Sequence, residues 1–207
     1  MARGHDLVGL TVLAMLSVRA GHPYELHRFI VDTHKDYVTG LPRSLYHAVE
    51  RLAKEELIVP VETTRGGRRP ERTVYEITEE GRDELTTRLR RLLEQPETDR
   101  RSFVAALSLI GCLPSPEAKK ALRTRAATLE GAVAGLASHR RALVESGLPE
   151  VLMLELECTQ ALQEAELAWV RGLIDRIGEG GIDWPLSTRR ALLDGVLDRV
   201  PEKTGEN

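Results

Sequence analysis

The chain has 207 residues, of which 42% are hydrophobic and 29% are charged, and its formal net charge at pH 7 is −3. This apolar content is enough to build the core of one large or two small domains, which excludes a chain that stays unfolded. The first residues, MARGHDLVGLTVLAMLSV, contain an apolar run that is too short and too interrupted to cross a bilayer. We therefore expect a folded cytoplasmic protein without a membrane segment.

The cysteines and histidines give no signature of a metal site or of catalysis. Cys112 and Cys158 are far apart in apolar surroundings, so we predict two buried free thiols, with a disulfide as the less favoured alternative in a reducing compartment. The six histidines form no HExxH motif or Cys/His cluster, and we expect surface or capping roles for them: His5, His22, His27, His34, His47 and His139. A nucleophile–base pattern and a glycine-rich phosphate loop are also missing, so we expect no enzyme activity and no cofactor.

Three amphipathic helices are predicted in the first part of the chain. The first covers residues 7–18 and ends before Gly21, and the second starts at Pro23 and covers residues 23–35. The third covers residues 42–57, PRSLYHAVERLAKEEL. Its apolar stripe repeats at the i, i+4, i+7 and i+8 positions, which are Leu45, Val49, Leu52 and Ala53.

A β-hairpin is predicted to follow the third helix. LIVPVETT, residues 57–64, and RTVYEI, residues 72–77, have the β-branched composition of strands, and Pro60 favours an edge position. Between them, RGGRRPE has the glycines and the proline of a turn. Thr78 is placed to cap an acidic helix start that continues to Pro96.

Positive charge is focused on this hairpin although the whole chain is slightly acidic. Against the single Glu71, residues 65–72 hold four arginines: Arg65, Arg68, Arg69 and Arg72. Local focusing of this kind is what a nucleic-acid contact requires. Three helices, a hairpin and a further helix predict a winged helix-turn-helix, in which the third helix enters the major groove and the hairpin reaches the flanking backbone or the minor groove.

The candidate DNA-binding residues lie on the polar face of the third helix and on the hairpin. On the helix they are Arg43, Ser44, Tyr46, His47 and Arg51, and on the hairpin they are Arg65, Arg68, Arg69 and Arg72. Arginine suits such positions because its planar guanidinium binds phosphate through two hydrogen bonds and stays charged. Two alternatives remain open, since Tyr46 could be an aromatic residue at the edge of the core and Arg51 could belong to a solvated helix face.

These segments together resemble the PadR family of bacterial transcriptional regulators. The resemblance is carried by LTVLAMLSVRAGHPYELHRFI, SLYHAVERLAKEELI and GGRRPERTVYEITEEGRDEL, and it covers about residues 5 to 95. The sequence departs from the family pattern at His22-Pro23, at Arg43, where a glycine is usual, and at Glu56, which replaces the glycine before Leu57-Ile58. The family pattern marks Ser44, Tyr46 and the hairpin arginines as DNA-facing.

The second half of the sequence is predicted to be almost entirely helical. A short apolar helix in DRRSFVAALSLIGCL is followed by two long amphipathic segments with a break at Gly147 to Pro149. We therefore expect a winged helix-turn-helix domain over residues 1–95 and a helical domain with a polar tail over residues 96–207. The second domain resembles the dimerisation domain of the larger PadR regulators, and a self-contained helical bundle is the alternative.

The resemblance implies a homodimeric transcriptional regulator that binds a double-stranded DNA operator. It also implies a repressor that is relieved by a small hydrophobic effector, bound between the winged helix and the dimer helices or at the dimer seam. Trp169 is the candidate effector-binding residue, although packing or a dimer interface is the favoured explanation of its position on an apolar stripe. The alternatives are a winged helix that mediates protein–protein contact and a regulator of another winged-helix family.

Overall fold

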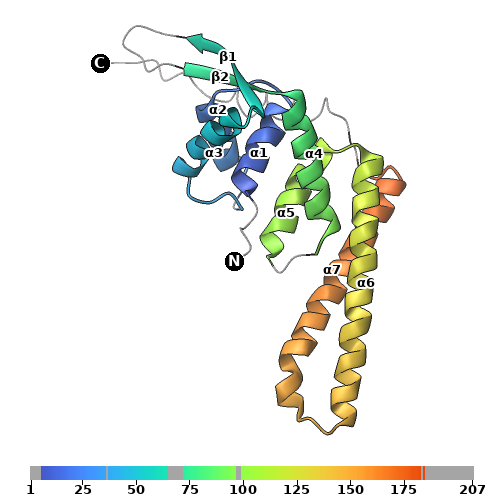
Figure 1. Cartoon of the computed structure of the whole chain (residues 1–207). Helices are drawn as coiled ribbons and strands as arrows, with labels where there is room; N and C mark the ends of the chain where they lie inside the picture. The colour runs from blue at the N-terminus through green and yellow to red at the C-terminus, as the bar shows by residue number, and fades with distance from the viewer. Residues whose placement is uncertain (1–5, 36, 65–71, 97–98, 183, 185–207) are drawn as a thin grey trace. The chain divides into compact units, whose positions relative to one another are not determined.

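A computed structural model describes residues 6–35, 37–64, 72–96, 99–182 and 184. Two 3₁₀ turns accompany the helices and strands, η1 at Ile110–Cys112 and η2 at Glu150–Met153. The helices and strands, in chain order, are α1 Leu7–Leu16, α2 Pro23–Asp32, α3 Arg43–Lys54, β1 Ile58–Thr64, β2 Arg72–Ile77, α4 Glu79–Glu94, α5 Arg100–Leu109, α6 Ser115–Glu145 and α7 Leu154–Gly178 (Figure 1). The mainly helical fold with a small β-hairpin that the sequence predicts is therefore confirmed.

By their contacts, the described residues divide into two compact units. The first takes in the described residues of Met1–Leu89 and Asp99–Leu113 together with Trp184. The second takes in the described residues of Arg90–Thr98 and Pro114–Asp183. In this division α5 belongs with the winged helix, whereas the sequence-based boundary after Gln95 places it with the carboxy-terminal helices.

Helix α1 is the centre of the first unit. Its residues from Gly9 to Leu16 are all buried. An α-helix that is apolar on every side must be covered on every side, and α1 contacts α3, α5 and β2. The core of the winged helix is therefore built around α1.

Asp6 holds the start of α1 in place. Its Oδ1 accepts a hydrogen bond of 3.0 Å from the backbone N–H of Gly9 and so caps the helix. Its Oδ2 is paired with the guanidinium of Arg51 on α3 and lies 3.7 Å from Nη1 of Arg88 on α4. One carboxylate thus joins the beginning of α1 to two other helices.

Helices α2 and α3 follow the predicted amphipathic pattern. Helix α2 begins with a capping box in which His22 Nδ1 accepts from Tyr24 N–H and Glu25 accepts from His22 N–H. The capping role expected of a histidine is therefore confirmed for His22. In α3, Leu45, Val49 and Leu52 are buried as predicted.

The chain just after α3 contains a residue other than glycine in the left-handed backbone conformation. Leu57 N–H donates to Leu52 C=O and Glu56 N–H donates to Ala53 C=O, which is the hydrogen-bond pattern of a Schellman motif. This motif needs a left-handed residue after the helix, and Glu56 has a φ of 57°. Glycine is the residue best suited to that conformation, so the departure from the family pattern at Glu56 falls on a backbone position where a side chain causes strain.

The hairpin has the predicted antiparallel pairing. Ile58 pairs with Ile77 and Thr64 with Arg72, with a register shift between Pro60 and Glu62. The hairpin leads into α4, where Thr78 Oγ1 accepts from Gly81 N–H at 3.0 Å, so the predicted cap is confirmed. A Cβ at Gly81 would lie 2.1 Å from the carbonyl oxygen of Leu57. Only glycine therefore allows this close approach of α4 to the start of the hairpin.

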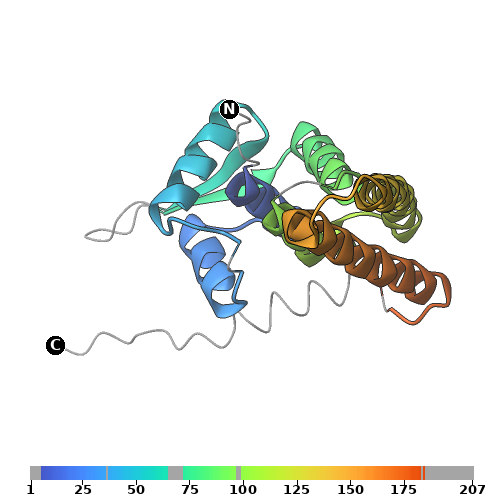
Figure 2. The same ribbon diagram turned by 90° about the horizontal axis from the view of Figure 1, so that it is seen from below.

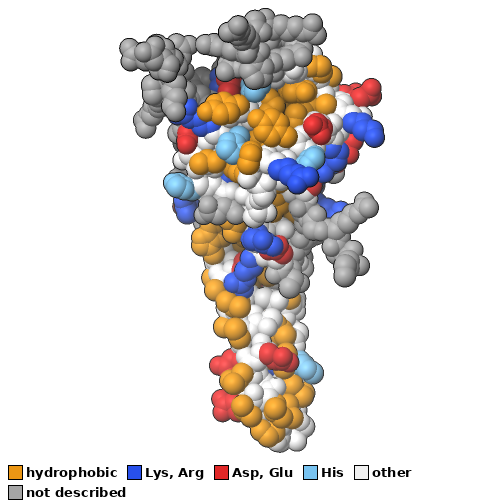
Figure 3. Space-filling view, turned by 90° about the vertical axis from the view of Figure 1, so that its left-hand side faces the viewer, with side chains coloured by type: hydrophobic (Ala, Val, Ile, Leu, Met, Phe, Trp, Pro, Cys, Tyr) orange, Lys and Arg blue, Asp and Glu red, His pale blue; other side chains and the backbone are white. Residues whose placement is uncertain are grey.

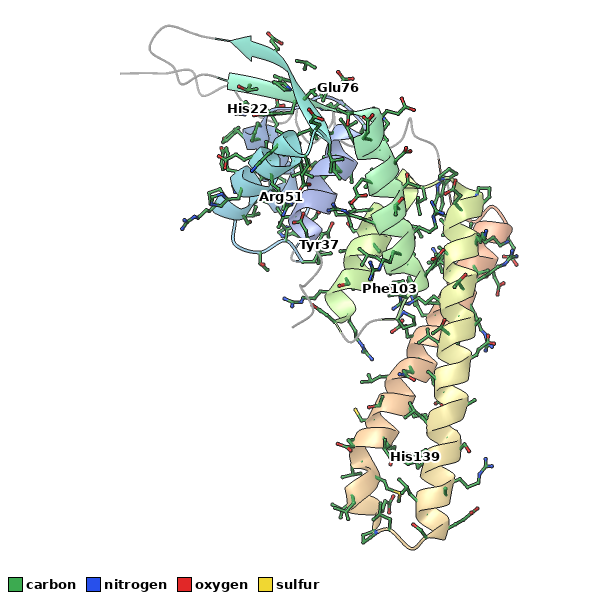
Figure 4. All side chains as sticks on the ribbon, viewed as in Figure 1. His22, Tyr37, Arg51, Glu76, Phe103 and His139 are labelled. Atoms are coloured by element: carbon green, nitrogen blue, oxygen red, sulfur yellow. The ribbon has the colours of Figure 1, made fainter. Side chains whose placement is uncertain are left out.

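Side chains of the loop after α2 form hydrogen bonds with α5 within the first unit. Lys35 Nζ and Tyr37 OH lie 2.7 Å and 3.2 Å from Ser108 Oγ. Burial raises the pKa of the Tyr37 phenol, and Phe103 on α5 is also buried (Figure 4). These contacts explain why α5 groups with the winged helix.

In the second unit, α6 and α7 form an antiparallel pair that lies side by side in both ribbon views (Figures 1 and 2). The break between them is confirmed, since Gly147 has a φ of 79° and α7 starts after η2. Helix α6 begins at Ser115 without a side-chain cap. Among the described residues, no helix is long and apolar enough to cross a membrane.

A buried arginine connects the elements of the second unit. Arg125 on α6 is only 2% exposed. Its Nη1 donates to the carbonyl of Gln95 at 2.8 Å and to that of Leu92 at 3.3 Å, and its Nη2 pairs with Glu166 on α7 at 2.6 Å. A buried charge is tolerated only when it is paired and hydrogen-bonded in this way.

The prediction of two buried thiols is wrong for Cys158. This residue lies on the outer surface of α7, whereas Cys112 is half-buried, and both are free cysteines. Among its apolar neighbours in the sequence, Leu154 and Leu162 are exposed and Leu156 is half-buried. Apolar neighbours in a sequence therefore did not mean a buried position in this case.

We expect Glu56→Gly to raise the free energy of unfolding by about 0.5–1 kcal/mol. The substitution relieves the left-handed strain, although the greater freedom of glycine in the unfolded chain offsets part of the gain. Urea denaturation of the full chain measures the change. Glu55→Gly is the control, because it removes the same charge at a position with a φ of −83°, where glycine relieves no strain; since it also removes the ion pair with Arg51, it should not raise stability. An equal gain in both variants would show that charge, not backbone strain, is responsible.

Candidate nucleic-acid interface

The outward face of α3 presents a column of polar and aromatic side chains. Arg43, Tyr46, His47 and Glu50 are all exposed, and their spacing places them on one side of the helix. The residues between them, Leu45, Ala48 and Val49, are buried. Because Tyr46 is 44% exposed, it is not a residue of the core.

Ser44 has a structural contact that the sequence does not reveal. Its hydroxyl donates to the carbonyl of Thr39 at 2.7 Å, and the side chain is half-buried. Ser44 therefore fastens the loop before α3 to the first turn of the helix. Its predicted role as a DNA contact stays a prediction.

Arg43 and His47 form a pair along the outer face. Arg43 Nε donates to His47 Nε2 at 3.3 Å, and His47 Nδ1 lies 3.7 Å from Glu50 Oε2. Since Arg43 makes no ion pair within the described part of the chain, its guanidinium keeps an uncompensated positive charge. This charge lies at the amino-terminal end of α3.

Arg51 is engaged differently from Arg43. Its guanidinium is paired with Asp6, and its Nε lies 3.8 Å from Glu55 Oε1 (Figure 4). These two carboxylates compensate its charge and hold the side chain toward the start of α1. The structure therefore gives Arg51 a role in packing α3 against α1, which the sequence pattern could not distinguish from a DNA contact.

The hairpin arginines are only partly covered by the structure. Arg72 is the first residue of β2 and pairs with Thr64, so it stands where the strands end. Arg65, Arg68 and Arg69 lie outside the described residues. The prediction that they bind DNA therefore stays a prediction.

Tyr24 on α2 is a candidate that the sequence analysis did not include. It is 56% exposed, and the exposed Val31 lies two turns further along the same helix. Figure 3 shows hydrophobic, basic and histidine side chains intermixed on the side of the first unit that carries α2 and α3. In the sequence, Tyr24 lies outside the apolar stripe that contains Leu26 and Ile30, and this position could have identified it as an exposed aromatic residue.

On the second unit, Trp169 is the predicted effector residue. It lies on α7 and is 49% exposed, so it is not a core residue of this chain. It ends a stripe of exposed residues at helical spacing, which are Leu154, Cys158, Leu162, Ala165 and Trp169. A group of three or more potential metal ligands does not occur among the described residues.

The first unit contains a winged helix, which consists of α1, α2, α3 and the two-stranded wing, and the outer face of α3 is exposed. A family model described as the transcriptional regulator PadR-like family matches residues 12–87, which lie within this unit. Residues 12–87 are therefore similar to the PadR-like family of transcriptional regulators. The resemblance inferred from the sequence is confirmed.

Solved structures similar to this chain include PadR of Bacillus subtilis in complex with operator DNA, with 19% identity, a TM-score of 0.39, and coverage of 82% of this chain and 98% of that one. PadR of B. subtilis in complex with p-coumaric acid has 16% identity, a TM-score of 0.38, and coverage of 86% and 99%. A PadR-like regulator of Bacillus cereus has 17% identity, a TM-score of 0.36, and coverage of 84% and 99%. No curated protein matches the sequence significantly.

We expect Tyr46→Ala to change the free energy of unfolding by less than about 0.5 kcal/mol, because the ring is exposed and alanine is a better helix former. Leu45→Ala, the neighbouring control, should cost about 2–5 kcal/mol because Leu45 is fully buried. Urea denaturation measures both values. If Tyr46→Ala lowered the free energy of unfolding as much as Leu45→Ala does, Tyr46 would be a packing residue of the core.

Proposed function

We propose that this protein is a homodimeric repressor that binds an operator in double-stranded DNA and is released by a small hydrophobic effector. The observation that carries the proposal is the outer face of α3, where exposed Arg43, Tyr46 and His47 surround the start of the helix while the opposite face is buried. In helix-turn-helix proteins, this end of the recognition helix approaches the base edges in the major groove.

The wing supplies the second part of the proposed DNA interface. Strands β1 and β2 extend to Thr64 and Arg72, and the sequence between these residues contains Arg65, Arg68 and Arg69. Phosphate contacts by such arginines would position the protein on the duplex without selecting a sequence. Arg43, Ser44, Tyr46 and His47 would then supply the contacts at the bases.

The proposed dimer uses the exposed stripe on α7. Leu154, Leu162 and Trp169 are large apolar side chains that are exposed on α7. Hydrophobic side chains are also visible along the α6–α7 pair in Figure 3. Their spacings of three and four residues are those of a helix seam. A second copy with the same stripe supplies the missing cover, and a two-fold dimer would present two recognition helices to two half-sites.

The DNA part of the proposal is tested by fluorescence anisotropy with labelled duplex at several salt concentrations. We expect the logarithm of the binding constant to fall linearly with the logarithm of salt, since phosphate contacts release counterions. Replacing both Arg68 and Arg69 by alanine should flatten the slope by about one to two units. Replacing Arg140 and Arg141 on α6 removes the same charge from the second unit and serves as the control.

Two results would contradict this part. Unchanged affinity and slope in the Arg68/Arg69 variant would show that the wing does not contact phosphate. Absence of duplex binding by the wild-type protein would favour a winged helix that contacts other proteins.

The dimer part is tested with Leu162→Glu in the full chain. We expect a change from dimer to monomer in sedimentation, because a charge in the middle of the seam cannot be covered. Thr159→Glu, at an exposed position outside the stripe, should remain dimeric. Labelling of Cys158 with a maleimide should be slow in the wild type and fast in Leu162→Glu, with Cys158→Ser giving the background from Cys112. A wild-type monomer, or a dimer unaffected by Leu162→Glu, would show that α7 has another role.

The effector part is tested through Trp169. A ligand beside this ring should quench its emission, and Trp169→Phe should remove the signal while Trp184 remains. Phenolic acids and planar cationic drugs are the compounds to titrate, with and without DNA. A tenfold loss of DNA affinity at saturation corresponds to about 1.4 kcal/mol of coupling. A compound that binds without changing DNA affinity is not the effector, and if none changes it, the protein is not controlled by these classes.

A further inference from the structure

We propose that Arg43 recognises a guanine in each half-site of the operator and that His47 holds it in position for this contact. The inference rests on the proposed DNA-binding function and goes beyond it by naming the base and the group that selects it. The family pattern has a glycine at this position, so a base contact by Arg43 would be a specificity of this chain.

The first argument is the placement of Arg43. It is the first residue of α3, and its exposed side chain belongs to the outer face of the helix. In helix-turn-helix docking, residues at the amino-terminal end of the recognition helix reach base edges, while residues further along the helix meet the backbone. Arg43 also keeps an uncompensated charge, unlike Arg51, whose guanidinium is paired with Asp6 and Glu55.

The second argument is the way in which the guanidinium is held. Its Nε donates to His47 Nε2 at 3.3 Å. A histidine nitrogen can accept such a hydrogen bond through its lone pair. On the other side of the ring, His47 Nδ1 lies 3.7 Å from Glu50 Oε2. Glu50, His47 and Arg43 therefore form a row along α3 that uses one donor of the guanidinium.

The third argument is chemical complementarity. With Nε occupied, Arg43 presents the N–H groups of its two terminal nitrogens, which are donors only. In the major groove, guanine offers two adjacent acceptors, O6 and N7, whereas adenine offers an acceptor beside a donor and cytosine offers a donor. Two parallel donors therefore match guanine and conflict with the amino groups of adenine and cytosine.

The proposal is tested by selecting bound duplexes from a randomised pool with the full-length wild-type protein and with Arg43→Gly. We expect a guanine at one position of each half-site in the wild-type pool and no preference there with Arg43→Gly. On the selected site, Arg43→Gly should bind about 5- to 150-fold more weakly, the effect of losing one bidentate base contact. On random duplex its affinity should change by far less.

Modified bases then identify the atoms. Replacing the selected guanine with 7-deazaguanine removes N7 and should weaken wild-type binding, whereas inosine keeps O6 and N7 and should bind like guanine. Arg43→Gly should not respond to either base. If Arg43→Gly loses affinity equally on selected and random duplex, or still responds to 7-deazaguanine, the assignment is overturned while DNA binding itself stands. If the wild type binds no duplex, the proposed function fails as well.

His47 is tested separately as a positioning residue. His47→Gln retains an acceptor for Arg43 Nε, whereas His47→Leu removes it. We expect His47→Leu to reduce the preference for guanine by about two- to tenfold, as for the loss of one hydrogen bond, and His47→Gln to restore it. On random duplex, the affinities of the two variants should differ from each other far less than they do on the selected site. Equal preference in the two variants would show that His47 does not position Arg43.

Discussion

The winged helix depends on the complete burial of α1. Because every residue from Gly9 to Leu16 is buried, α1 cannot fold without partners on all sides, and α3, α5 and β2 supply them. Asp6 then sets the position of this helix, since it caps the first turn and pairs with Arg51 on α3 and Arg88 on α4. The orientation of α3, and with it the direction of the candidate interface, follows from these two features.

This constraint divides the charged residues of α3 between two tasks. Arg51 faces the carboxylates of Asp6 and Glu55 and stabilises the packing of the helix. Arg43, two turns earlier, donates to His47 and makes no ion pair with the residues that the structure describes. Two arginines on one polar helix face therefore differ in their ion pairs because one of them lies beside the capping residue of α1.

The second unit is organised by Arg125 in a similar way. Its guanidinium binds the carbonyls of Leu92 and Gln95 and the carboxylate of Glu166, so that the last turn of α4, α6 and α7 meet at one buried charge. Burying an arginine is unfavourable unless each donor finds an acceptor, which makes this arrangement specific for one packing of the helices. Away from Arg125, α7 has an exposed apolar stripe. This exposed stripe is the basis of the proposed dimer seam.

Periodicity and composition were enough to predict most elements of the fold, and the motifs within residues 5 to 95 carried the resemblance to the PadR family. The stripe of Leu45, Val49 and Leu52, the strands on either side of the arginine-rich turn, and the cap at Thr78 are local patterns, and local hydrogen bonding and burial decide them. The sequence also identified Glu56 as unusual, but only the backbone showed that it occupies a left-handed position. The grouping of α5 with the winged helix, the exposure of Cys158, the pairing of Arg51 with Asp6 and the burial of Arg125 were decided by the tertiary structure. Each of these depends on contacts between residues far apart in the chain, which the spacing of residues along one helix does not contain.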